Sequence, residues 1–231
     1  MRPSLAGLVR STVGHAARLL VDTDRVSERR VRAYIGLGAN VGDAEATLTA
    51  AVRALAALPG ARLRAVSRLY ATDPVGVVDQ AEFRNAVVAL DVPGDREPEP
   101  GALALLVALK DVERDFGRRM RGRWGPRELD LDLLVYGRAR LAIERPPTAR
   151  SVDADADPAK ASKLLEVPHP AAATRLFVLA PLADLSSGLV PPGWGCTVAT
   201  ARRRQTTIEG PDAVRAIGDW DPIARRWNAR A

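Results

Sequence analysis

The chain has 231 residues, of which 47% are hydrophobic and 27% are charged, a composition typical of a soluble globular protein with a substantial core. The single cysteine excludes an internal disulfide, and with only two histidines it offers no Cys/His zinc spacing, so a reducing, cytoplasmic setting is expected. No apolar run approaches the roughly 18 residues that indicate a membrane span.

The net charge of +6 is concentrated at the two ends of the sequence. Residues 1–32 contain seven arginines against three acidic residues, and residues 201–231 contain seven against four. Residues 33–200 are nearly neutral, with 20 basic and 21 acidic side chains. A nucleic-acid-binding face would need its positive charge on the folded part of the chain. The distribution therefore argues against a nucleic-acid partner.

Hydrophobic periodicity and turn residues predict an alternating series of strands and helices. The expected elements are a strand at Arg32–Leu37, a helix at Ala44–Leu58 with Asp43 as its N-cap, strands at Arg62–Tyr70 and Arg84–Asp91, a turn-rich connection at Pro93–Gly101, a helix at Ala102–Phe116, a strand at Leu129–Tyr136, a further strand at Arg138–Glu144 and a helix at Arg175–Leu185. The order strand-helix-strand-strand-helix-strand is the ferredoxin-like plan, an α+β fold in which two helices pack on one face of an antiparallel sheet.

Three segments lie outside this plan. Residues 1–31 lack a core pattern and are expected to form a flexible N-terminal extension. The domain proper is expected at 32–187, with a flexible insertion at 146–162 that is rich in Pro, Asp and Ala. Residues 188–231, which include a run of three arginines, are expected to form a peripheral basic extension with C-terminal additions to the fold.

The strand expected at Leu129–Tyr136 carries two carboxylates on one face. Asp130 and Asp132 alternate with leucines, so both acidic side chains point the same way. Their spacing of roughly 6.6 Å lets them converge on two metal ions about 3.5–4 Å apart. Two like charges in an apolar strand are costly unless compensated. Either arginine partners compensate them in a structural ion network, or Mg²⁺ does.

The segment Gly117–Arg127, just before this strand, contains five arginines and no acidic residue. No GK[S/T] phosphate loop occurs, but Mg²⁺ on acidic ligands together with an arginine clamp can also hold a nucleoside triphosphate. Arg118, Arg121 and Arg127 could each bind phosphate oxygens. The alternative is a solvated basic loop, and its position next to the aspartates favours the anion site. Trp124 is either a core aromatic or a platform for a flat ring.

His169 lies between two prolines, which fix the backbone around it. A lone histidine is usually structural, but one presented rigidly could also bond a phosphate. The pattern does not identify it as a catalytic base.

Several motifs together resemble the hydroxymethyl-dihydropterin pyrophosphokinases of folate synthesis, over roughly Ala33 to Leu185. The most specific are RWGPRELDLD at Arg123–Asp132 and VPHPAAATRLFVLAPL at Val167–Leu182. The supporting motifs are YIGLGAN at 34–40, YATDPVG at 70–76, QAEFRNA at 80–86 and ERDFGR at 113–118.

The chain is expected to be a monomer. The resemblance implies an enzyme in which the hydroxymethyl oxygen of 6-hydroxymethyl-7,8-dihydropterin attacks the β-phosphorus of ATP and AMP leaves. It implies two Mg²⁺ ions at Asp130 and Asp132, with Arg118 and Arg127 also taking part in catalysis. The implied ATP contacts are Arg118, Arg121, Arg127, His169 and Arg175. The implied pterin contacts are Trp124 and Phe177 on the two ring faces, with Thr72, Val75, Phe83 and Asn85 around them.

The sequence departs from the family pattern in the arginine loop, which is one residue shorter than usual and leaves Arg119 as an alternative to Arg121. Phe83 stands where a tyrosine is often found. Two other functions share features with this sequence. A palm-type nucleotidyltransferase would use the same sheet and two metals but release pyrophosphate, and a ferredoxin-like RNA-binding module would stack bases on strand aromatics, which are scarce here. An inactive relative is a third alternative, against which the retained aspartate pair argues.

Overall fold

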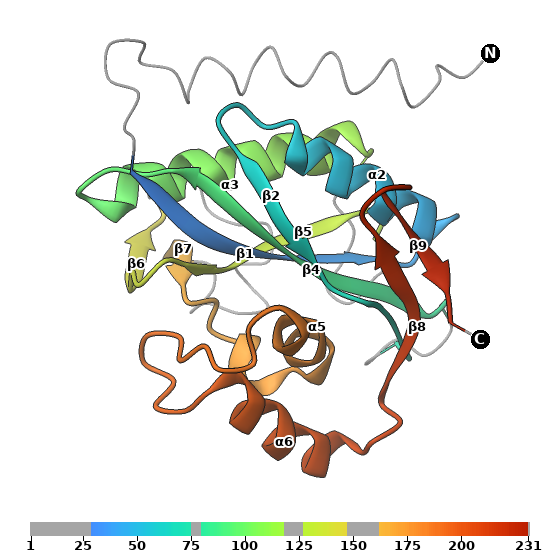
Figure 1. The fold of residues 1–231 in the computed structure, drawn as a ribbon. Helices are drawn as coiled ribbons and strands as arrows, with labels where there is room; N and C mark the ends of the chain where they lie inside the picture. The colour runs from blue at the N-terminus through green and yellow to red at the C-terminus, as the bar shows by residue number, and fades with distance from the viewer. Residues whose placement is uncertain (1–28, 75–79, 118–126, 147–161, 231) are drawn as a thin grey trace, which may run out of the picture.

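The structure is a computed structural model that describes residues 29–74, 80–117, 127–146 and 162–230. Its centre is an antiparallel seven-stranded sheet (Figure 1). The strands are β1 (Arg30–Ala39), β2 (Arg62–Val66), β3 (Leu69–Thr72), β4 (Phe83–Pro93), β5 (Asp130–Tyr136), β8 (Val214–Asp221) and β9 (Arg226–Ala229). They lie in the order β5-β1-β4-β3-β8-β9, and β2 pairs with β4 beside β3.

The first part of the chain follows the ferredoxin-like order that the sequence predicts. Helix α2 (Ala44–Ala56) connects β1 to β2, and helix α3 (Pro98–Asp115) connects β4 to β5. The Asp43 side chain accepts a hydrogen bond from the backbone N of Ala46 at 2.9 Å and so caps α2 as expected. Both helices cover the same face of the sheet (Figure 1). The core on this face includes Ile35, Leu37, Leu48, Leu55, Leu109 and Leu131.

Helix α3 begins at Pro98, four residues before the predicted start at Ala102. Glu99 falls within the connection predicted at Pro93–Gly101, and that prediction was wrong here, since Glu99 lies in the first helical turn. Proline is tolerated there because the first N–H groups of a helix have no intrahelical acceptor. An acidic residue in the first turn also interacts favourably with the positive end of the helix.

The single strand predicted at Arg62–Tyr70 is in fact two strands, β2 and β3, separated at Ser67 and Arg68. Both pair with β4, which keeps them in one sheet. At the break the backbone N of Ser67 donates to the carbonyl of Val87, and the hydroxyl of Ser67 accepts from the backbone N of Val87, both at 2.9 Å. A side chain thus replaces one rung of the ladder, and the strand bends without leaving a buried amide unpaired.

The other face of the sheet is covered by α5 (Leu176–Ser186), against which α6 (Val198–Glu209) packs, so the fold adds helices on the face opposite the two predicted ones (Figure 1). The predicted helix at Arg175–Leu185 is α5. Tyr34, Val87, Leu134 and Leu179 belong to the second apolar cluster, which α5 helps to form. A short 3-10 turn at Ala172–Thr174, η1, precedes α5, and β6 (Leu141–Glu144) pairs with β7 (Lys163–Val167) in a small separate sheet. No helix within the described ranges is long and apolar enough to cross a membrane.

The C-terminal residues do not form the peripheral tail that the sequence suggested. Strand β8 pairs with β3 and, together with β9, enlarges the central sheet. Trp227 of β9 is only 3% exposed, joins the core on the α2 side and donates its indole N–H to the carbonyl of Ser67 at 2.9 Å. The ring of Trp220 packs edge-on against it, with centroids 4.8 Å apart. Trp227 is the only apolar side chain of β8 and β9 that is buried, which explains why the sequence pattern resembled a solvated tail.

Candidate active site

The two aspartates lie in a row of side chains that crosses the sheet on the face toward α5. In the strand register, Asp130 and Asp132 of β5 pair with Gly38 and Gly36 of β1, and Gly38 pairs on its other side with Asn85 of β4. Directly paired residues project from the same face of a sheet. The carboxylates and the amide of Asn85 are therefore separated by residues that have no side chain.

Because Gly36 and Gly38 have no side chains, only backbone forms the sheet surface between the two carboxylates and the Asn85 amide. A Cβ atom on Gly38 would lie 3.4 Å from Oδ1 of Asn85, and one on Gly36 would lie 3.4 Å from the Leu134 side chain. A larger residue at Gly38 would therefore fill the space beside the Asn85 amide. The strand expected at Arg32–Leu37 in fact continues to Ala39, so both glycines lie within β1. In the sequence, Gly36 and Gly38 are separated by one residue, and this spacing was the signal that they share one face of a strand.

Asp130 and Asp132 differ in their surroundings. The Asp130 carboxylate is ion-paired with the guanidinium of Arg127, three residues earlier. Among the residues that the structure describes, the Asp132 side chain has no ion-pair partner, and it is neither fully buried nor exposed. Arg127 therefore compensates the charge of Asp130, whereas the oxygens of Asp132 remain available to bind a cation.

Asn40 holds the segment that carries Arg127. Its side chain is 5% exposed, and its Oδ1 accepts from the backbone N of Arg127 at 2.8 Å while its backbone N donates to the carbonyl of Arg127 at 3.0 Å. Its Nδ2 donates to Oε1 of Gln80 and to the carbonyl of Ala81, both at 3.1 Å. One buried amide therefore joins the end of β1 to the approach to β5 and to the approach to β4. The sequence analysis did not assign Asn40 a role.

Glu113 of α3 supports β5 between the two aspartates. Its side chain is 2% exposed, and its Oε1 accepts from the backbone N of Leu131 at 2.7 Å and from Nζ of Lys110 at 2.8 Å. Lys110 also donates to the carbonyl of Leu131 at 3.3 Å. The backbone groups of Leu131 that face away from β1 thus bond to a charged pair on the helix. This support was also missed, although Glu113 belongs to one of the motifs quoted above.

Thr72 and Asn85 form the second polar group on this face. The Nδ2 of Asn85 donates to the hydroxyl oxygen of Thr72 at 2.8 Å, and both residues are buried. Phe83 pairs with Thr72 in the register and is half-buried beside them. The structure therefore brings together three of the residues expected to contact the pterin. With one of its two N–H groups engaged by Thr72, the Asn85 amide still has the second N–H group as a donor and Oδ1, near Gly38, as an acceptor.

The loop before α5 places His169 and Arg175. The backbone N of His169 donates to the carbonyl of Leu134 at 2.9 Å, which fixes this loop to the strand of the aspartates. The Nδ1 of His169 accepts from the backbone N of Ala171 at 3.3 Å. Arg175 is the residue before α5, and its guanidinium carbon lies 5.7 Å from the centroid of the Phe177 ring, within the range of a cation–π contact.

Four predicted site residues, Val75, Arg118, Arg121 and Trp124, lie outside the described residues. So do residues 147–161, most of the expected insertion. In the ranges that are described, no group of three or more metal-ligating side chains occurs. Two carboxylates suit Mg²⁺, which usually binds one or two of them and completes its shell with waters and substrate phosphates. The residues present therefore fit Mg²⁺ carried in with a nucleotide better than they fit a closed zinc site.

The acidic pair with its adjacent arginine fits an enzyme that binds a phosphate-bearing substrate together with Mg²⁺. Residues 34–187 match the sequence model of the family described as 7,8-dihydro-6-hydroxymethylpterin-pyrophosphokinase (HPPK). The chain belongs to this family. It is a diphosphotransferase of folate biosynthesis that uses ATP as co-substrate, which confirms the recognition made from the motifs.

Curated relatives agree with this assignment, and a solved structure shares the fold. The chain is 38% identical over 178 residues to the 2-amino-4-hydroxy-6-hydroxymethyldihydropteridine pyrophosphokinase of Methylorubrum extorquens, covering 77% of this chain and 97% of the relative. It is 40% identical over 161 residues to the Pseudomonas aeruginosa enzyme of the same name, covering 70% and 84%. The wild-type Plasmodium falciparum HPPK-DHPS structure with STZ-DHP shares the fold, with a TM-score of 0.61 at 13% identity over 88% of this chain. The chain spans about half of that structure, 47%.

Proposed function

We propose that the chain transfers the pyrophosphoryl group of ATP to the hydroxymethyl oxygen of 6-hydroxymethyl-7,8-dihydropterin. The oxygen attacks the β-phosphorus, the bond from that phosphorus to the bridging oxygen of the α-phosphate breaks, and AMP leaves. The proton of the hydroxymethyl group is released to solvent. The observation that carries this proposal is the row formed by Asp130, Gly38 and Asn85, which places a carboxylate and a buried amide on opposite sides of a bare strip of sheet.

On this proposal Asp130 and Asp132 hold two Mg²⁺ ions, and those ions would neutralise charge on the triphosphate. Basic residues of the chain supply the other proposed contacts with the triphosphate. Arg127, already oriented by Asn40, lies beside Asp130 and can turn toward phosphate oxygens. His169 and Arg175 approach from the α5 side of the same face. Arg118 and Arg121, outside the described residues, complete the proposed ATP contacts.

The proposed pterin site consists of Thr72, Phe83 and Asn85 on the sheet and Phe177 on α5, with Val75 and Trp124 as further contacts outside the described residues. Asn85 would bond the edge of the pterin through Oδ1 and through the N–H group that Thr72 does not engage. Phe177 would cover one face of the ring and Trp124 the other. No general base is assigned, because holding the oxygen in line with the phosphorus and stabilising charge supply most of such a reaction's acceleration.

Product analysis tests the proposal. The chain is incubated with ATP, Mg²⁺ and the pterin, and nucleotides are separated by anion-exchange chromatography. AMP with diphosphorylated pterin is expected. ADP would indicate a simple kinase, free pyrophosphate would indicate a nucleotidyltransferase, and the absence of turnover would indicate a binding protein. Sedimentation equilibrium of the same sample tests the monomeric state that we also propose.

A further inference from the structure

The first turn of α5 carries two proposed site residues. Arg175 is the N-cap of the helix and Phe177 is its second residue, and they flank Leu176, which is buried. Arg175 contributes no side-chain hydrogen bond as the cap. The position of the first turn of α5 therefore determines where both side chains lie.

A residue far along the chain supplies the missing cap. Glu209, the last residue of α6, accepts a hydrogen bond at its Oε1 from the backbone N of Leu176 at 3.0 Å. Nε2 of Gln205, one turn earlier on α6, donates to the same oxygen at 2.7 Å and holds the carboxylate in place. The carboxylate satisfies an N–H group that has no partner within the helix and interacts favourably with the positive end of α5.

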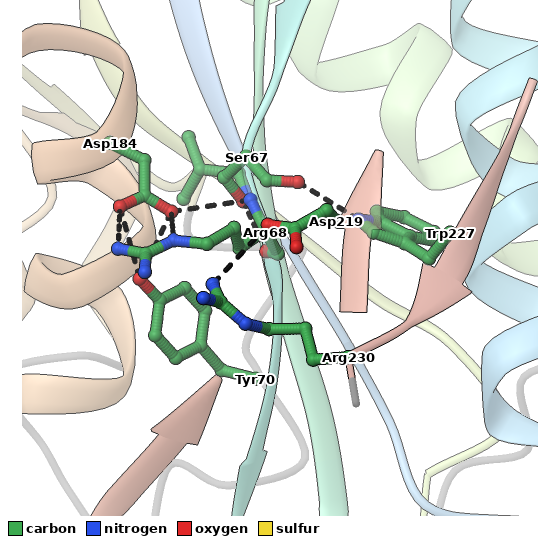
Figure 2. A network of polar contacts seen from close by, with 8 residues as sticks. Ser67, Arg68, Tyr70, Asp184, Asp219, Trp227 and Arg230 are labelled. Atoms are coloured by element: carbon green, nitrogen blue, oxygen red, sulfur yellow. Dashed lines mark hydrogen bonds and ion pairs between the residues drawn. The ribbon is translucent and has the colours of Figure 1, made fainter. Parts of the chain in front are cut away.

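The other end of α5 is fixed to the sheet. Asp184 accepts from the hydroxyl of Tyr70 at 3.0 Å and from the backbone N and Nε of Arg68 at 3.2 and 3.0 Å. Figure 2 shows the side chains of Arg68 and Tyr70 both reaching the Asp184 carboxylate. Tyr70 pairs with Asn85 in the register, so this anchor joins α5 to the strands of the proposed pterin site. The start of α5 depends on Glu209 instead.

We propose that Glu209 is a positioning residue for the substrate site, which holds Arg175 and Phe177 in place by capping α5 from α6. The proposal rests on the proposed function, since it takes these two residues as contacts of the triphosphate and the pterin. Glu209 lies beyond residues 34–187, the part that matches the family model. The C-terminal segment is therefore part of the machinery that shapes the site.

The test compares three variants of the full chain. Glu209→Ala removes the acceptor, whereas Glu209→Gln keeps an oxygen that can accept from Leu176. Arg204→Ala, an exposed residue on the same helix, is the matched control. Hydrogen exchange of the peptide around Leu176 is measured without substrates, and the KM values for ATP and pterin are measured with kcat. Losing a cap of this kind shifts the opening of a first helical turn by about tenfold.

For Glu209→Ala, exchange of the first turn of α5 about tenfold faster than wild type is expected, with KM values raised about three- to tenfold and kcat changed less than threefold. Glu209→Gln and Arg204→Ala are expected to match wild type within about twofold. The proposal is overturned if Glu209→Ala behaves like the Arg204→Ala control, or if Glu209→Gln is as impaired as Glu209→Ala. If Glu209→Ala does not fold, Gln205→Ala takes its place, because it removes the hydrogen bond that holds the Glu209 carboxylate. This variant is expected to show the same changes to a smaller degree. Wild-type behaviour of Gln205→Ala would then overturn the proposal.

The two readouts separate this inference from the proposed function. A wild-type chain that forms no AMP contradicts the proposed function, while the exchange measurement still reports on the cap. A wild-type chain that forms AMP, together with unchanged exchange in Glu209→Ala, contradicts only the inference.

Discussion

Removing the Glu113 carboxylate tests how β5 is held. Glu113 bonds the backbone N of Leu131, between the two aspartates, and its side chain is 2% exposed. In Glu113→Ala the amide of Leu131 loses its acceptor in a place that water reaches poorly. In Glu113→Gln the side-chain oxygen can still accept from Leu131, and only the charge facing Lys110 is lost.

The expected magnitudes follow from these contacts. A buried donor left without a partner costs about 1–3 kcal/mol, and a hydrogen bond to a charged acceptor is worth about 1.5–3 kcal/mol. The ion pair itself adds little, because the Lys110 side chain is 40% exposed and screened by solvent. Glu113→Ala is therefore expected to lower the free energy of unfolding by about 2–3 kcal/mol, and Glu113→Gln by about 1 kcal/mol. Against a typical total of ~5–15 kcal/mol, the first change is large.

Urea unfolding at constant temperature, followed by tryptophan fluorescence, measures these values. Arg114→Ala is the matched control, because Arg114 lies one residue further along α3, is 72% exposed and pairs only at the surface with Asp111 among the described residues. That variant is expected to stay within ~0.5 kcal/mol of wild type. The Mg²⁺ concentration for half-maximal activity is expected to rise in Glu113→Ala as β5 loosens. A Glu113→Ala variant no less stable than the control would refute the reasoning.

Three further predictions concern the site and its frame. Asp132→Asn is expected to lose at least ~100-fold in turnover while its unfolding curve stays that of a folded protein. A turnover rate equal to that of wild type would contradict the assignment of Asp132 as a metal ligand. Gly38→Ala is expected to raise the KM for the pterin more than the KM for ATP, because the added Cβ would lie 3.4 Å from Oδ1 of Asn85; equal effects on both would contradict the proposed placement of the pterin. Burial, and then the nearby Asp184 carboxylate, raises the pKa of the Tyr70 hydroxyl. The folded state thus favours neutral Tyr70, and this stabilisation is complete below the ordinary tyrosine pKa of about 10 and is lost as the pH rises above it. Wild type should therefore lose stability more steeply than Tyr70→Phe as the pH rises above about 10, and parallel curves would argue against the shift.

The strand of the aspartates was predictable because alternation is a local property. Asp130 and Asp132 are fixed to one face by the pleat alone, whatever the strand pairs with. The same holds for the Asp43 cap, whose partner is three residues away. The order of elements then gave the ferredoxin-like plan, since few topologies accommodate it.

The remaining features depend on contacts between distant parts of the chain. Asn40 bonds Arg127 across 87 positions, and the indole of Trp227 bonds Ser67 across 160. Neither hydrogen bond leaves a recognisable pattern in the sequence around its two residues. The break between β2 and β3 was missed for the same reason, because it is stabilised by Val87 on another strand. The C-terminal hairpin contributes mainly one tryptophan to the core, too little to give a periodic signal.

The central claim is the chemistry of the transfer, and the fate of ATP tests it most directly. With ATP labelled at the β-phosphate, Mg²⁺ and 6-hydroxymethyl-7,8-dihydropterin, we predict that the label moves to the pterin and that unlabelled AMP forms in equal amount. Label that remains in ADP, or that appears as free pyrophosphate while AMP becomes attached to the pterin, would contradict the account.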